Sequence, residues 1–311
     1  MPTTGPAARD SGVVVARLSS RGVVAYRLRV RESIGKGLKR VVRKELRSAI
    51  DALDDTNPSD DAIHEARKSI KKVRAAVQLV GAEVETTGAL KELRRASRLL
   101  SPVRDAQALV ESAGALFAHD ARSVSPSARA AVTNALEQDK SRMRRAAARD
   151  QAFTKALRSL RKLRRSMKSW KWQRVGASDL IPEIRDRYKK ARRRMRRVSG
   201  AGEADAFHEW RKQIKALWYA LRLIERRVPA RLDLKALGHL ETWLGDDHNL
   251  VVLRAQMASH VRSDPQRRYA SSVQHVARRR QQALRHTAIA LGTRVFDDVP
   301  RRFARRLKAI R

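Results

Sequence analysis

Residues 61–80 read DAIHEARKSIKKVRAAVQLV, and residues 205–224 read DAFHEWRKQIKALWYALRLI. Both stretches carry a histidine that is followed by a basic residue three, four and seven positions later. Side chains at these spacings lie on one face of an α-helix, so each stretch predicts a helix with a positively charged face. We call these two faces the basic stripes, and their members are His64, Arg67, Lys68 and Lys71 in the first copy and His208, Arg211, Lys212 and Lys215 in the second.

The opposite face of each predicted helix is apolar. The first apolar row contains Ile63, Ala66, Ile70, Val73, Val77 and Val80, and the second contains Phe207, Trp210, Ile214, Leu217, Leu221 and Ile224. Steps of three and four residues between apolar positions are typical of a helix that packs one face into a core. We therefore expect both helices to belong to helical bundles, with the basic stripes turned away from the core.

A second pair of similar segments follows the first. Residues 99–109 read LLSPVRDAQAL and residues 243–253 read WLGDDHNLVVL, so that Asp105 follows His64 at the same distance as Asn249 follows His208. Such a constant offset indicates a tandem duplication, with the junction near residues 169–184. In each half, a turn of small residues is expected just before the Arg-Asp or His-Asn pair.

The rest of the chain is predominantly helical in pattern. Apolar residues recur at helical spacing from Ile34 to Leu53, the segment DDTNPSDD at 54–61 ends that helix, and Ser59 or Asp60 is placed to cap the next one. Strand signals are nearly absent, although the alternation in residues 13–28 would suit a terminal hairpin. We predict an all-α protein with a tail at 1–24 and two four-helix bundles, at 25–175 and 176–311.

The net charge indicates the class of partner. The 311 residues include 70 Lys and Arg against 32 Asp and Glu, a formal charge of +38, and basic runs at 157–174 and 189–198 extend the positive surface. Such a chain favours polyanions: nucleic acid, an acidic membrane surface or polyphosphate. The absence of cysteine excludes disulfides and thiolate chemistry, and the short apolar run at 12–16 predicts no membrane insertion, so a cytoplasmic protein is expected.

The duplicated stripes, their constant spacing to the second element and the helical pattern resemble the CHAD domain, the conserved histidine α-helical domain. The resemblance covers residues 25–311. It implies two four-helix bundles related by a pseudo-twofold axis, a basic central groove that binds inorganic polyphosphate, and association with polyphosphate granules. Besides the stripes, it assigns Arg74, Arg104, Tyr188, Arg192, Arg193, Arg222 and His248 to the binding site. Asn249 departs from the family, which usually has Asp at this position.

No catalytic, metal-binding or cofactor-binding pattern was found. HEARK and HEWRK lack the second histidine of a zinc-protease motif, GDDHN at 245–249 has no matching cluster of ligands, and no glycine-rich phosphate loop is present. A non-catalytic binding protein without a cofactor is therefore expected. Sequence-nonspecific binding of nucleic acid stays open as the alternative, although aromatic residues for base stacking make up only 5% of the chain.

Overall fold

The computed structural model describes residues 26–80, 84, 86–120, 122–201, 204–227, 233–259 and 264–307. All regular structure within these ranges is helical, so the predicted all-α class is confirmed. The predicted tail at 1–24 lies outside the described residues, as does most of the possible hairpin at 13–28. Three short 3-10 turns accompany the α-helices, two of them in the connection between the halves, at Met167–Ser169 and Trp172–Arg174.

The α-helices follow one another in two series of five. The first series is α1 (Ile34–Asp51), α2 (Asp60–Val77), α3 (Thr87–His119), α4 (Pro126–Arg149) and α5 (Ala152–Ser166). The second is α6 (Ala177–Ala201), α7 (Ala204–Ile224), α8 (Leu234–Ser259), α9 (Asp264–Val295) and α10 (Pro300–Leu307). The helices α2 and α7 begin at Asp60 and Ala204, the same offset that separates the two stripes. The internal duplication itself stays a prediction.

The helix boundaries confirm one sequence signal and contradict another. Ser59 caps α2 as expected, because its hydroxyl accepts a hydrogen bond from the Ala62 N–H at 3.1 Å. The expected turn before the Arg-Asp and His-Asn pairs is wrong: Pro102 lies inside the continuous helix α3, and residues 243–253 lie inside α8. A proline ring removes one backbone donor from a helix without necessarily ending it, and here the long helix continues beyond it.

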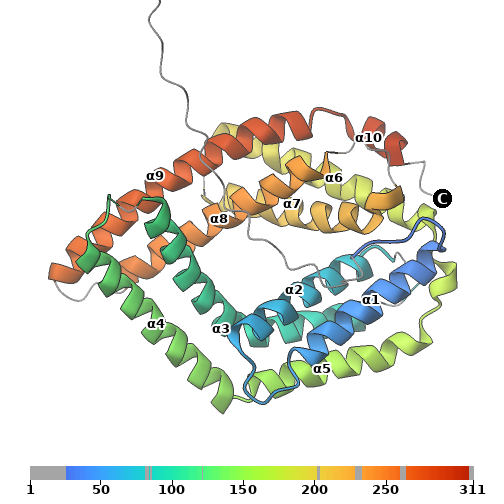
Figure 1. Ribbon diagram of the computed structural model, residues 1–311. Helices are drawn as coiled ribbons and strands as arrows, with labels where there is room; N and C mark the ends of the chain where they lie inside the picture. Colours follow the sequence, from blue (N-terminus) through green and yellow to red (C-terminus); the bar gives the residue numbers. More distant parts are fainter. Residues whose placement is uncertain are drawn as a thin grey trace, which may run out of the picture.

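The buried apolar residues form two clusters, and neither follows the halves of the sequence. The larger cluster combines α1, α2, α5, α6, α7 and α10 with the nearer ends of the other helices. The smaller cluster joins the C-terminal parts of α3 and α8 to α4 and α9, which meet at the left of Figure 1. Each cluster thus contains helices from both sides of the predicted boundary between residues 175 and 176.

The N-terminal described segment also ties the halves together. The Leu28 N–H donates to the Leu223 carbonyl at 2.7 Å, at the end of α7. The Arg227 guanidinium donates to the carbonyl oxygens of Arg29 and Glu32, and its Nε–O distance to Arg29 is 3.0 Å. Residues that precede α1 in the sequence are thus held by the second series of helices.

Packing between the two series positions the basic stripes. Both apolar rows predicted from the sequence are buried. Helix α2 contacts α7, and α3 contacts α8, in the middle of the molecule (Figure 1). Two stripes that are far apart in the sequence are therefore brought onto neighbouring helices.

Candidate anion-binding groove

A groove of about 730 Å³ lies where α2, α3, α7 and α8 meet. We call it the central groove. Its basic lining residues are His64, Arg67, Lys68, Lys71, Arg74, Arg104, Arg211, Lys212, Lys215 and His248. Both stripes therefore open into one space, and seven of their eight residues line it.

Arg67 of the first stripe is held in place by α3. Its Nη1 donates to the Ser97 carbonyl at 3.1 Å and to the Ser101 hydroxyl at 2.5 Å, and its Nη2 lies 3.3 Å from an Asp105 carboxylate oxygen. The three partners stand four residues apart and so share one face of α3. They fix the direction of the guanidinium, and Asp105 partly offsets its charge.

Lys71, one helical turn further along, has no such partner. It is half-buried and makes no hydrogen bond or ion pair with any residue that the structure describes. Burial and the nearby charges of Lys215, Arg67 and Arg211 lower the pKa of Lys71 to about 7. A substantial fraction of its side chains is thus a neutral amine at neutral pH, although a lysine is usually fully charged there.

The second stripe has the opposite arrangement. Lys215, the counterpart of Lys71, lies 2.6 Å from a carboxylate oxygen of Glu241. Arg211, the counterpart of Arg67, makes no hydrogen bond or ion pair within the described ranges, and its Nε is buried without a partner. The sequence explains the exchange, since Ser97, Ser101 and Asp105 correspond to Glu241, Gly245 and Asn249. Each stripe thus keeps one half-buried unpaired cation, at alternate positions.

Three histidines in or beside the groove have lowered pKa values. His208 and His248 approach through their Nδ1 atoms at 3.1 Å, so one ring must donate and the other accept. Burial, followed by the charge of Arg211, lowers the pKa of His248 to about 4. Burial also lowers the pKa values of His208 and His64, and Arg104 contributes to the shift at His64. We therefore expect all three rings to be neutral at pH 7.

The outer cations are held only weakly. Lys68 pairs with Glu65 at 3.0 Å and Lys212 with Glu209 at 2.6 Å, each within its own helix. Both lysine side chains are substantially exposed, and exposed pairs of this kind contribute little to stability. These two lysines can therefore turn to an anion at small cost.

Three predicted site residues lie elsewhere. Tyr188 is buried, its hydroxyl donates to the Asp298 carbonyl at 3.0 Å, and its ring stacks on Phe303. The Arg192 Nε donates to the Phe296 carbonyl at 2.9 Å, and Arg193 is an exposed residue of the same helix α6. The first two fasten α6 to the corner between α9 and α10, and none of the three lines the central groove.

Three residues of the site were not predicted from the sequence: Trp218, Glu241 and Ser97. Trp218 lines the groove, and the guanidinium of the predicted residue Arg222 lies over its ring at 4.8 Å. Glu241 and Ser97 determine which cation of each stripe is paired. The helical spacing back from Asn249 and Asp105 was the available signal, because positions eight residues earlier share their face.

Comparisons with known proteins agree with this fold. A family model of the CHAD domain matches residues 37–258, which include both stripes. A crystal structure of the CHAD domain from the plant Ricinus communis superposes with a TM-score of 0.64 at 18% identity, covering 88% of this chain and 94% of that one. PptA from Streptomyces chartreusis gives a TM-score of 0.60 at 15% identity, with coverages of 86% and 100%.

A search of curated proteins finds no match to this chain. Among the described residues, no group of three or more His, Asp or Glu side chains is arranged to hold a metal ion. No helix in the described ranges is both long and apolar enough to cross a membrane.

Proposed function

Because this chain belongs to the CHAD domain family, we propose that it binds inorganic polyphosphate in the central groove, without hydrolysing it. The observation that carries the proposal is the pair of half-buried cations without partners, Lys71 and Arg211. Burial lowers the pKa of both Lys71 and Arg211, so their charged forms cost free energy in the absence of an anion. A chain of phosphates would remove that cost.

The other groove residues suit the same ligand. Linear polyphosphate offers closely spaced charges and no bases, so a site for it needs cations rather than stacking surfaces. Arg67 and Arg211 can contact phosphate oxygens through two N–H groups at once, whereas Lys68 and Lys212 act as mobile point charges. Release of counterions from the phosphate chain would supply most of the affinity.

The proposed role is binding rather than catalysis. The groove presents cations and histidines, and two of its three carboxylates are engaged: Asp105 lies against Arg67, and Glu241 against Lys215. Burial raises the pKa of the third, Asp246. We further propose that binding places the protein at polyphosphate granules in the cytoplasm. A fluorescent fusion should then mark granules in cells, and the groove variant described next should lose that localisation.

A binding competition tests the proposed function. Long-chain polyphosphate and duplex DNA, at equal charge concentrations, are titrated against the wild type, against Lys68→Glu/Lys212→Glu, and against Arg196→Glu/Arg197→Glu. The last pair is exposed on α6 and gives the same change of net charge. We expect the wild type to bind polyphosphate more tightly than DNA. The affinity for polyphosphate should fall much further in Lys68→Glu/Lys212→Glu, the groove variant, than in Arg196→Glu/Arg197→Glu, the control.

Two other outcomes are decisive. Equal loss of polyphosphate affinity in the two variants, with both still folded by circular dichroism, would show that the stripes are only part of a general basic surface. Preference of the wild type for DNA would support the nucleic-acid alternative instead.

A further inference from the structure

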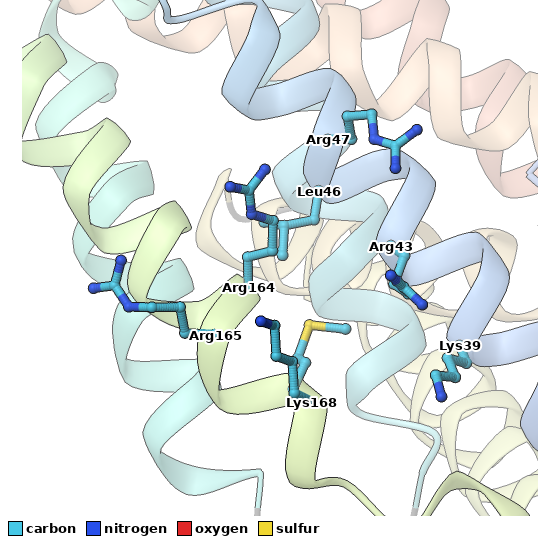
Figure 2. Close-up of a pocket in the computed structure, with 8 residues that line it drawn as sticks. Lys39, Arg43, Leu46, Arg47, Arg164, Arg165 and Lys168 are labelled. Atoms are coloured by element: carbon cyan, nitrogen blue, oxygen red, sulfur yellow. The ribbon is translucent and has the colours of Figure 1, made fainter.

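A second basic cleft, of about 650 Å³, lies between α1 and α5 (Figure 2). We call it the α1–α5 cleft. Its cations are Lys39, Arg43 and Arg47 from α1 and Arg164, Arg165 and Lys168 from the end of α5 and the turn that follows it. Its apolar lining is Leu46 and Met167, both buried. The cleft shares no lining residue with the central groove.

The charge of this cleft is uncompensated. None of its six cations has a hydrogen bond or ion pair with a residue that the structure describes, and Figure 2 shows their polar groups on both sides of the opening. Helix α5 contains no acidic residue, and the nearby Asp54 is engaged by Arg161 at 2.7 Å. The central groove, by contrast, contains carboxylates that pair with part of its cations.

The cleft is also not a by-product of the repeated sequence. At the positions of α6 that correspond to Lys39, Arg43 and Arg47, the chain has Glu183, Arg187 and Ala191. Of these, Arg187 is buried and donates to the Gln78 carbonyl at 3.2 Å. At these positions α6 therefore lacks the row of cations that α1 contributes to the cleft.

We propose that the α1–α5 cleft is a second binding site for a linear chain of condensed phosphates, independent of the central groove. The choice of ligand rests on the proposed function, but the site itself does not. Arginines and lysines on facing walls can contact one phosphate chain from both sides. Two such sites on separate sets of helices would let one protein molecule hold two chains, or two parts of a long one.

Other polyanions fit this space less well. The axes of packed helices lie about 8–10 Å apart. A DNA duplex is wider than this, since its major groove by itself is about 12 Å wide, so a duplex could contact only the rim of the cleft. Single-stranded nucleic acids gain affinity from stacking on aromatic rings, and none lines the cleft. Surface binding to a membrane uses exposed apolar side chains, whereas Leu46 and Met167 are buried.

Calorimetry with a short polyphosphate of defined length tests the inference by counting sites. The cleft variant is Arg43→Gln/Arg164→Gln, the groove variant is Lys68→Gln/Lys212→Gln, and the control is Arg196→Gln/Arg197→Gln. Each removes two positive charges from exposed or half-buried side chains. We expect two bound chains per protein in the wild type and in the control, and one in each of the other variants. A site that is lost should give no binding at any salt concentration. If a variant site still binds weakly, the plot of its log affinity against log salt concentration should have a slope smaller in magnitude by about 2, because two cations have been removed.

The failures of the two proposals differ. Two bound chains in the cleft variant, with the same affinities as in the control, would overturn the second site and leave the groove proposal intact. Two bound chains in the groove variant but one in the cleft variant would overturn the groove proposal and keep the cleft. An equal loss of binding in the cleft variant and the control would also overturn the second site. Melting of each ligand-free variant checks that it is folded.

Discussion

Polyphosphate binding should take up protons, and Lys71 should be the main cause near neutral pH. In the free protein the pKa of Lys71 is about 7, because it is buried beside Lys215, Arg67 and Arg211. A phosphate chain in the groove would stabilise the charged form and raise that pKa toward the ordinary value of about 10.4. Above pH 7, binding must therefore bring a proton with it.

The size of the effect follows from linkage. Between the pKa of the free state and that of the bound state, the affinity falls about tenfold per pH unit for one proton taken up. We expect close to a tenfold weaker affinity at pH 8.5 than at pH 7.5, and a much smaller change from Lys71 between pH 5.5 and 6.5, where the amine is already charged. Proton uptake should approach one per bound chain at pH 8.5.

Titration calorimetry in two buffers of different ionisation enthalpy measures this uptake, at constant ionic strength. Lys71→Arg keeps the charge at every pH and should abolish most of the uptake and flatten the loss of affinity above pH 7. Lys212→Arg serves as the control, since Lys212 is exposed, and should leave the pH dependence unchanged. The same slope and the same proton uptake in the wild type and Lys71→Arg would refute the role assigned to Lys71.

Three further predictions concern single features of the structure. Glu241→Gln should make the free energy of polyphosphate binding more favourable, on the order of 1–2 kcal/mol, because it removes a negative charge from the groove and releases Lys215. Calorimetry at fixed salt measures the affinity, and an unchanged affinity would contradict this prediction. Gly35→Ala should lower the free energy of unfolding by about 1–3 kcal/mol in chemical denaturation, because the new Cβ would lie 1.8 Å from the Trp172 carbonyl oxygen, a backbone atom; stability equal to the wild type would show that the turn can shift freely. The purified protein should release no phosphate from polyphosphate or nucleoside triphosphates, and release that is abolished by one groove substitution would identify an enzyme instead.

The sequence predicted the helices and their apolar and basic faces better than it predicted which side chains of other helices contact those faces. The positions of the stripes and of the apolar rows follow from helical spacing alone, as Ile70 and Ile214 in the core illustrate. Which cation is paired depends on α3 and α8, and so on packing between segments some thirty residues apart. Spacing along α2 or α7 contains no information about Glu241.

Basic runs were the least informative signal. The resemblance to the CHAD domain assigned Tyr188 and Arg192 to the site, and they lie in a basic run, yet their register turns them toward the corner between α9 and α10. The run at 157–174 correctly indicated positive charge on α5. It could not indicate a cleft, because the other wall comes from α1, more than a hundred residues earlier.

The unpaired cation lies at a different position in each stripe, and this difference affects the direction in which a bound polymer can lie along the groove. A phosphate chain reads the same from either end, so a groove whose halves differ can accept it in both directions with the same contacts. A nucleic acid strand has a 5′ and a 3′ end, and unequal halves would have to distinguish them. For a ligand without polarity, substitutions such as Ser97 against Glu241 can accumulate in one half as long as the other supplies the missing contact. A polyphosphate ligand, as proposed, would therefore allow the two stripes to differ in sequence without loss of binding.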